Sequence, residues 1–293
     1  MAKRPDWLLR SLLFAPGNHP RKVAKVGSFG ADAIVLDLED AVAAAEKTAA
    51  RAPVRAALPG YPNTLVMVRV NGPASGRWAG DLDAVVCPAL RAVVVPKVEA
   101  PAELREVDEH LARLEEREGL TPGTIRMIPQ IETARGIVRV DEIALQAPAR
   151  VQTLIFGQAD FTADLGIDLT SDGDELLYAR SRVVVAARAA GLAPPIDGPY
   201  LFGLQDQPGL VRDSERARRL GFQGKIVIHP SQVEPVNRVF GAVSPEELAA
   251  AREIVTAFEA AEAAGSAAIQ VAGRFVDYPI YRQALRKLQL PQK

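Results

Sequence analysis

The chain has 293 residues, of which 48% are hydrophobic and 24% charged, and its 35 basic and 36 acidic side chains give a formal net charge of -1. This balance excludes a fibrous or disordered chain and disfavours nucleic acid as a partner. A single cysteine, Cys87, excludes an internal disulfide or a metal-binding cysteine pair. A membrane-spanning helix needs about 20 consecutive apolar residues, and no stretch of the sequence is that long. We therefore expect a cytoplasmic protein.

Short β-branched apolar runs alternate along the chain with longer segments of helical composition, which is typical of βα repeats. The apolar runs predict eight strands, at 11–15, 33–38, 64–70, 92–95, 125–131, 153–156, 195–198 and 225–228. Helical patterns lie between them, as at 41–57, 101–118, 134–145, 175–190 and 209–220. Eight such units without a glycine-rich dinucleotide-binding loop favour an α/β fold of the closed (β/α)8 TIM barrel type over an open doubly wound sheet.

The pattern changes after the eighth predicted strand. Segment 244–264 predicts a long helix with Ser244 as its N-cap, and a basic helix is expected at 279–288. A short apolar run at 269–272 lies between them, and the barrel needs no ninth strand. We therefore expect a catalytic barrel domain at 1–235 and a C-terminal helical extension at 236–293.

Polar residues that end the strands of a (β/α)8 barrel face the mouth of the active site. Here they are mostly carboxylates, with one histidine: Asp37, Glu39, Asp40, Arg69, Asn71, Lys97, Gln130, Glu132, Gln158, Asp160, Asp197, His229 and Gln232. Oxygen ligands suit Mg²⁺ or Mn²⁺, whereas Zn²⁺ prefers histidine and cysteine. Glu132 and Asp160 end adjacent strands and form the best pair to hold a cation. The alternative is that either acid caps a helix or pairs with an arginine.

Arg69 lies inside the apolar strand MVRVN, where a guanidinium must meet carboxylates or a substrate anion. Asp37 and Glu39 are its expected partners, and a purely structural ion network is the alternative. Lys97 would allow Schiff-base chemistry, but its carboxylate-rich surroundings favour a metal-dependent aldolase. His229 is expected to anchor a loop rather than to act as a base.

The chain resembles the citrate lyase β-subunit-like branch of the HpcH/HpaI aldolase superfamily, which includes malyl-CoA and citramalyl-CoA lyases. The segments that carry the resemblance are, in order, LLFAPGNHPRKVAK, DAIVLDLEDAV, VRVNGP, PQIETARGI, FGQADFTADLG, GFQGKIVIHPSQ and FVDYPIYRQA. The resemblance implies a Mg²⁺-dependent lyase that cleaves a 3-hydroxyacyl thioester, such as citryl-, malyl- or citramalyl-CoA, into an acetyl-type thioester and a 2-oxo acid. A thioesterase acting on a malyl-type thioester, or a citrate lyase β subunit acting on an acyl-carrier-protein thioester within a complex, are the alternatives.

The resemblance also implies roles for residues in the barrel. Glu132 and Asp160 would hold Mg²⁺, with Mn²⁺ as the alternative, and Arg69 would be a catalytic residue facing the substrate carboxylate or the forming enolate oxygen. The acids of DLED would surround the metal's water ligands and Arg69; these are Asp37, Glu39 and Asp40.

Three further residues are implied to contact the thioester. Arg21 and Lys25 lie where relatives place basic residues near the CoA phosphates. Asp277, in VDYP, matches a catalytic acid that is delivered into the barrel of a neighbouring subunit, which implies that the extension packs on that subunit in a homotrimer or hexamer. The alternative for Asp277 is an N-cap of the last helix.

Overall fold

The computed structural model describes residues 7–241 and 245–289, and the chain divides into two compact units, Met1–Phe240 and Gly241–Lys293. The boundary expected from the sequence, at residue 235, falls inside helix α10 (Val233–Gly241). Within the described ranges, every helix is too short or too polar to cross a membrane.

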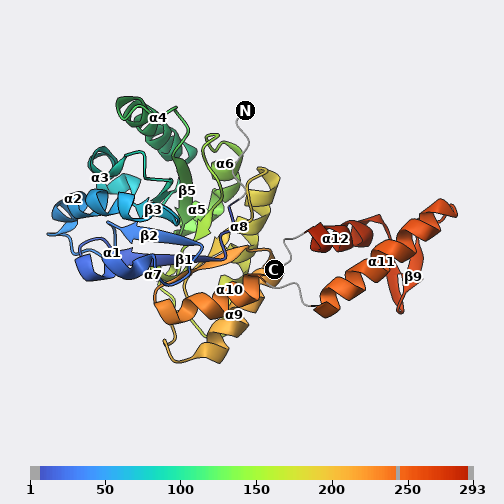
Figure 1. Cartoon of the computed structure of the whole chain (residues 1–293). Helices are drawn as coiled ribbons and strands as arrows, with labels where there is room; N and C mark the ends of the chain where they lie inside the picture. Colours follow the sequence, from blue (N-terminus) through green and yellow to red (C-terminus); the bar gives the residue numbers. More distant parts are fainter. Residues whose placement is uncertain (1–6, 242–244, 290–293) are drawn as a thin grey trace. The chain divides into compact units, whose positions relative to one another are not determined.

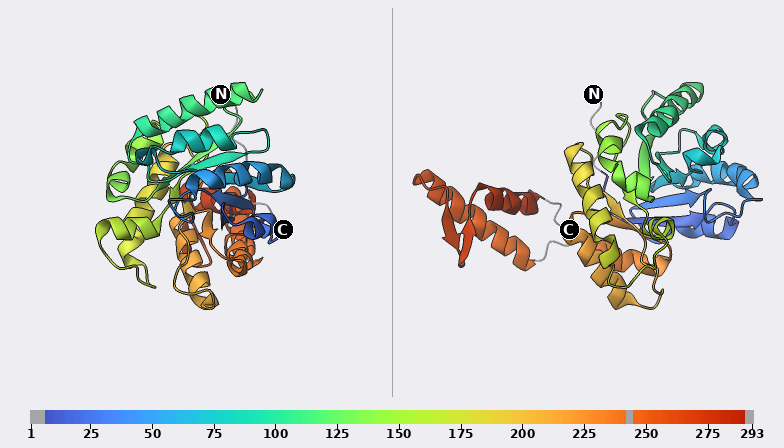
Figure 2. Two further views of the ribbon diagram at one scale, coloured as in Figure 1. Left: turned by 90° about the vertical axis from the view of Figure 1, so that its left-hand side faces the viewer. Right: turned by 180° about the vertical axis from the view of Figure 1, so that it is seen from behind.

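The first unit is a barrel of eight parallel strands, which pair in sequence order and close between β8 and β1, with the helices outside (Figure 1, Figure 2). The prediction of a (β/α)8 TIM barrel is therefore confirmed. The strands are β1 (Ser11–Pro16), β2 (Ala33–Asp37), β3 (Leu65–Arg69), β4 (Ala92–Val95), β5 (Arg126–Ile131), β6 (Ile155–Phe156), β7 (Ile196–Asp197) and β8 (Gly224–Val227).

The helices of this unit follow the strands along the chain. They are α1 (Pro20–Val26), α2 (Lys47–Ala57), α3 (Trp78–Val85), α4 (Pro101–Arg117), α5 (Ala134–Val138), α6 (Val140–Leu145), α7 (Gln158–Leu165), α8 (Leu177–Ala189), α9 (Gln207–Leu220) and α10, with 3-10 turns η1 (Leu58–Gly60), η2 (Pro73–Ser75), η3 (Asp174–Leu176) and η4 (Pro230–Gln232). Helix α2 begins later than predicted. In the loop before it, the Asp37 carboxylate accepts hydrogen bonds from the backbone N–H groups of Glu39 (2.9 Å) and Ala41 (3.1 Å).

The pleat of the strands decides which side chains enter the barrel. Val35 of β2 and Met67 of β3 belong to the buried cluster inside the barrel, whereas their chain neighbours pack against the surrounding helices. Two positions further along the same strands lie Asp37 and Arg69, and the parallel register places these two residues opposite each other. The alternation therefore brings an acid and an arginine together at the carboxyl ends of β2 and β3.

The second unit contains α11 (Pro245–Ala263), the antiparallel strands β9 (Ile269–Val271) and β10 (Arg274–Val276), and α12 (Tyr278–Gln289). The two strands form their own sheet and are separate from the eight-stranded barrel. Ser244, the expected N-cap, lies outside the described residues. The core of this unit is built around Phe258, Val271 and Val276, and the ring of Phe258 stacks on Tyr281 with centroids 4.7 Å apart.

Candidate active site

Glu132 enters the barrel mouth directly after β5. Ile128 belongs to the inner core, and the alternation directs Gln130 and Glu132 to the same side. The Glu132 carboxylate is fully buried and accepts hydrogen bonds from the backbone N–H of Lys97 (2.8 Å) and from Nε2 of Gln130. Burial, reinforced by the charge of Asp160, raises the pKa of Glu132 to about 8. A cation bound beside Glu132 would favour the ionised form of its carboxyl group.

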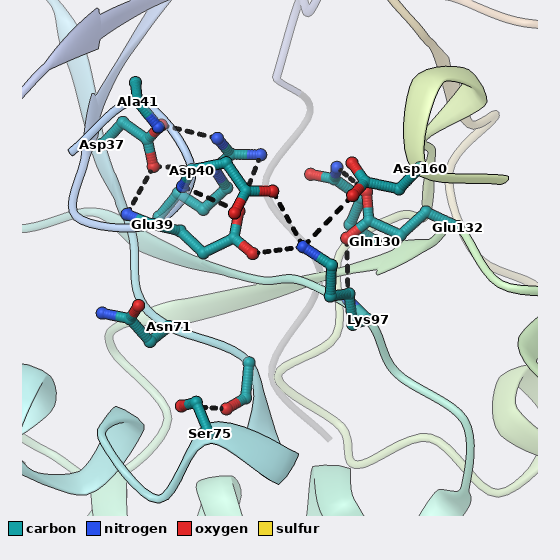
Figure 3. A network of polar contacts seen from close by, with 12 residues as sticks. Asp37, Glu39, Asp40, Ala41, Asn71, Ser75, Lys97, Gln130, Glu132 and Asp160 are labelled. Atoms are coloured by element: carbon teal, nitrogen blue, oxygen red, sulfur yellow. Dashed lines mark hydrogen bonds and ion pairs between the residues drawn. The ribbon is translucent and has the colours of Figure 1, made fainter. Parts of the chain in front are cut away.

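The end of β6 passes very close to Glu132. A Cβ atom on Gly157 would lie 2.5 Å from Cβ of Glu132 and 3.0 Å from Nε2 of Gln130, so only glycine fits here. Helix α7 starts at the next residue and carries Asp160 in its first turn, and the Asp160 side chain is one-third exposed. Figure 3 shows Asp160 beside Glu132. Glu132 directly follows β5, whereas Asp160 reaches this place from the first turn of α7 rather than from the end of β6.

Lys97 lies between two groups of carboxylates (Figure 3). Its Nζ is 2.5 Å from Oε1 of Glu39, 2.8 Å from Oδ2 of Asp40 and 3.2 Å from Oδ1 of Asp160. Its backbone is left-handed, with a φ of 54°, and its N–H points to Glu132. Burial would lower the pKa of Lys97, but the hydrogen bonds and charges of Asp40 and Glu39 raise it above its ordinary value. The ammonium group stays protonated, which argues against a Schiff-base nucleophile.

Arg69 meets both of its expected partners. Two hydrogen bonds join it to Asp37, from Nε to Oδ1 (2.7 Å) and from Nη2 to Oδ2 (2.5 Å), and its Nη1 is 3.3 Å from Oε2 of Glu39. Burial would lower the pKa of Arg69, but the charges of Asp37 and Glu39 hold it above its ordinary value. A guanidinium has five N–H groups, so these contacts leave donors for a substrate anion in the mouth.

The donor set fits a divalent cation. Five carboxylates surround two cationic side chains in this cluster, so the ionised groups leave an excess of negative charge; the residues are Asp37, Glu39, Asp40, Glu132, Asp160, Arg69 and Lys97. No three His, Cys, Asp or Glu side chains in the described ranges are arranged to enclose a metal. Oε1 of Gln130 is buried and has no hydrogen-bond partner among those residues. Mg²⁺ suits such a site, because it binds one or two carboxylates and keeps several water ligands. One of these waters could donate a hydrogen bond to the unpaired carbonyl oxygen of Gln130.

A cavity of about 360 Å³ lies at the carboxyl ends of β1 and β8. Arg21 and Lys25, both exposed on α1, line it together with His229 and Phe14. The ring of Phe14 also lies 5.2 Å from Cζ of Arg69, so one side chain borders both the cavity and the acidic mouth. His229 is the N-cap of η4 and accepts a backbone hydrogen bond there, in agreement with its expected role as a loop anchor.

Two residues singled out in the sequence have other contacts. Asp277 belongs to the second unit, where its Oδ1 accepts a hydrogen bond from the backbone N–H of Ile280 (3.3 Å) as an N-cap of α12. Asp197 ends β7, but it pairs with Arg180 (2.9 Å) and Lys225 (2.5 Å) behind the strands rather than with the acidic mouth.

Sequence reasoning missed Gly157 and the bridging role of Lys97. Gly157 directly follows the apolar run of β6 and directly precedes a helix, a position where a glycine indicates close packing. Lys97 contacts Glu39, Asp160 and Glu132, which follow three different strands, and no local sequence pattern predicts contacts between segments so far apart.

The barrel and its acidic mouth define an enzyme of the (β/α)8 type. The chain belongs to the HpcH/HpaI aldolase/citrate lyase family, whose family model matches residues 10–230. The citrate lyase subunit beta of Leuconostoc mesenteroides subsp. cremoris is 38% identical over 285 residues, which cover 97% of this chain and 93% of that protein. The mitochondrial citramalyl-CoA lyase of Mus musculus is 36% identical, covering 94% of this chain and 83% of that protein.

Protein CitE from Mycobacterium tuberculosis, solved in complex with magnesium, acetoacetate and coenzyme A, is similar in structure. It is 32% identical, with a TM-score of 0.75, and the match covers 96% of this chain and 97% of that one. The family and the lyase class predicted from the sequence are therefore confirmed.

Proposed function

We propose that the chain is a Mg²⁺-dependent carbon–carbon lyase that cleaves a 3-hydroxyacyl thioester, such as citryl-, malyl- or citramalyl-CoA, into an acetyl-type thioester and a 2-oxo acid. The observation that carries this proposal is the meeting of Glu132 and Asp160 in the barrel mouth (Figure 3), where Arg69 pairs with Asp37 and Glu39. Glu132 and Asp160 would hold the cation. When bound, Mg²⁺ would supply Lewis acidity to the oxygen that becomes the keto oxygen of the 2-oxo acid.

The remaining groups of the mouth act on the substrate. The bond between the hydroxyl-bearing carbon and the α-carbon of the thioester breaks, its electron pair passes to the α-carbon, and the hydroxyl proton passes to solvent water. Arg69, fixed by Asp37, offers its remaining N–H groups to the enolate oxygen or the substrate carboxylate. A proton added to the α-carbon completes the acetyl-type thioester.

Asp277 supplies that proton from a neighbouring subunit in this proposal, so the active form is a homotrimer or hexamer. The support is the resemblance of the VDYP segment. The helix-capping contact of Asp277 uses Oδ1, and such a contact orients the carboxyl group while Oδ2 can carry the proton. The two alternatives for this residue are thus compatible in geometry.

The thioester would bind along the cavity bordered by Phe14. Arg21 and Lys25 are exposed cations on its wall and would bind the phosphates of CoA or of the phosphopantetheine group of an acyl carrier protein. The acyl group would then extend past Phe14 to Arg69.

A substrate panel tests the proposal. Malyl-, citramalyl- and citryl-CoA are each incubated with the protein and Mg²⁺, and the 2-oxo acid and acetyl-CoA are quantified, with Glu132→Ala as the control. We expect the two products in equal amounts from one of the thioesters. Release of free CoA with the intact hydroxy diacid would show a thioesterase instead, and activity restricted to carrier-protein thioesters would show the complex-bound form.

A further inference from the structure

A buried network of four charges lies behind the barrel wall, between β7, β8, α8 and α9. Arg180 and Lys225 each pair with Asp197 and Asp213 at N–O distances between 2.5 and 3.0 Å, and none of the four side chains is more than 10% exposed. Such a network is costly to desolvate, and replacing one by apolar residues is often neutral or stabilising. Stability alone therefore does not explain its presence.

One hydrogen bond leads from this network toward the active site. Nη2 of Arg180 donates to Oε1 of Gln158 (3.0 Å), and Nε2 of Gln158 donates to the carbonyl of Pro199 (2.6 Å). Gln158 is 2% exposed, and a Cβ atom on Gly198 would lie 2.8 Å from its Cγ. The Gln158 amide is therefore held at both ends and pressed against the loop that follows β7.

Gln158 is the first residue of α7, and Asp160 lies in the same turn. Residues two apart in a helix lie on different sides of it, so the side chain of Gln158 can be fixed in the wall while Asp160 stays in the mouth. Among the described residues, the Asp160 carboxylate makes one ion pair, with Nζ of Lys97 at 3.2 Å. The place of its carboxylate thus depends on the place of the α7 backbone.

We infer that Arg180 and Gln158 are positioning residues for Asp160: the buried network fixes Arg180, Arg180 fixes the Gln158 amide, and Gln158 fixes the start of α7. This inference rests on the proposed function, in which Asp160 holds the divalent cation. Replacing a residue that orients a metal ligand commonly lowers the metal affinity by about 10- to 100-fold.

Binding of Mn²⁺ to the full chain, followed by electron paramagnetic resonance, tests the inference without relying on turnover. Gln158→Met removes both amide contacts at similar volume. Gln152→Met is the matched control, because Gln152 is also buried but precedes β6 at the opposite end of the barrel. We expect Gln158→Met to weaken Mn²⁺ binding about 10-fold or more and Gln152→Met to change it less than about 2-fold, at similar losses of Tm.

A second pair of variants separates positioning from stability. Arg180→Lys is compared with Arg150→Lys. The native Arg150 side chain is 3% exposed and pairs with Asp108 and Glu115 on α4. Both changes should lower Tm, but only Arg180→Lys should weaken Mn²⁺ binding. Equal weakening in both, or unchanged binding in Gln158→Met, overturns the inference.

Asp160→Asn distinguishes a failure of the positioning role from a failure of the proposed cation site. Loss of Mn²⁺ binding in Asp160→Asn with wild-type binding in Gln158→Met refutes the positioning role alone. Equal Mn²⁺ binding by the wild type and Asp160→Asn refutes the proposed cation site, and the positioning role with it.

Discussion

Replacing Gly157 by alanine tests whether the site depends on the close approach of β6 to Glu132. The added Cβ would lie 2.5 Å from Cβ of Glu132, whereas ordinary carbon contacts are about 3.5–4.0 Å, so one of the two must move by about 1 Å. The backbone φ of Gly157 is -101°, which alanine adopts without strain, so the effect is one of contact alone. Overpacking of this kind costs about 1–3 kcal/mol in the free energy of unfolding. A 1 Å displacement of a catalytic group lowers activity by about 100-fold.

The assay compares Mg²⁺-dependent kcat/KM and urea unfolding of Gly157→Ala with those of Gly60→Ala. An added Cβ on Gly60 would meet no atom within 4 Å, so this control should keep wild-type activity and change stability by less than about 1 kcal/mol. Wild-type kcat/KM and unfolding free energy in Gly157→Ala would refute the argument that this close approach shapes the site.

Three further changes probe the other groups. Glu132→Ala should abolish metal-dependent turnover with the fold intact, and full activity of this variant in EDTA would exclude the metal. In the wild type, removing Mg²⁺ that was present at 100 times its Kd should lower the free energy of unfolding by about 2.7 kcal/mol, measured as a lower Tm. Arg69→Lys keeps the charge but loses the planar fork that binds Asp37, so kcat/KM should fall about 10-fold or more, and wild-type kcat/KM would make Arg69 a replaceable structural cation. Asp277→Asn should keep Mg²⁺ binding and the oligomer but lose turnover by about 10² to 10⁴. Mixing it with Glu132→Ala subunits should restore part of the activity, and no recovery in verified mixed oligomers would exclude delivery across the interface.

The acidic mouth could be predicted because parallel strands end at one edge and the side chains alternate along them. Those two facts place Asp37 opposite Arg69 and direct Glu132 into the mouth. Asp160 lies beyond the end of β6, in the first turn of α7, so the alternation along the strand does not reach it. The start of α2 could not be predicted in this way. The turns between Asp37 and Lys47 are shaped by contacts from elsewhere in the fold, such as the Asp37 carboxylate that Arg69 of β3 holds in place, and the composition of 41–57 does not contain them.

Asp197 shows where strand-end reasoning fails. Strand β7 has two residues, so its sequence contains no alternation long enough to separate the inner from the outer face. Ile196 fills the inner core and Asp197 therefore faces the helices, where Arg180 and Lys225 lie. Arg180 is a charged residue on a helix face shared with buried Ala179 and Val183, and that face indicates burial only once its tertiary partners are known.

The thin core of the second unit has a consequence for how this part of the chain opens. Domains of about 60 residues bury a smaller share of their surface than larger domains do and are marginally stable, and here Phe275 remains 64% exposed. The backbone amides of α11 and α12 should therefore exchange with deuterium through local opening at a lower free energy than those of the barrel strands. In the proposed function the proton donor, Asp277, caps the start of α12, so slowed exchange in α12 on adding a thioester would indicate that Asp277 engages the substrate.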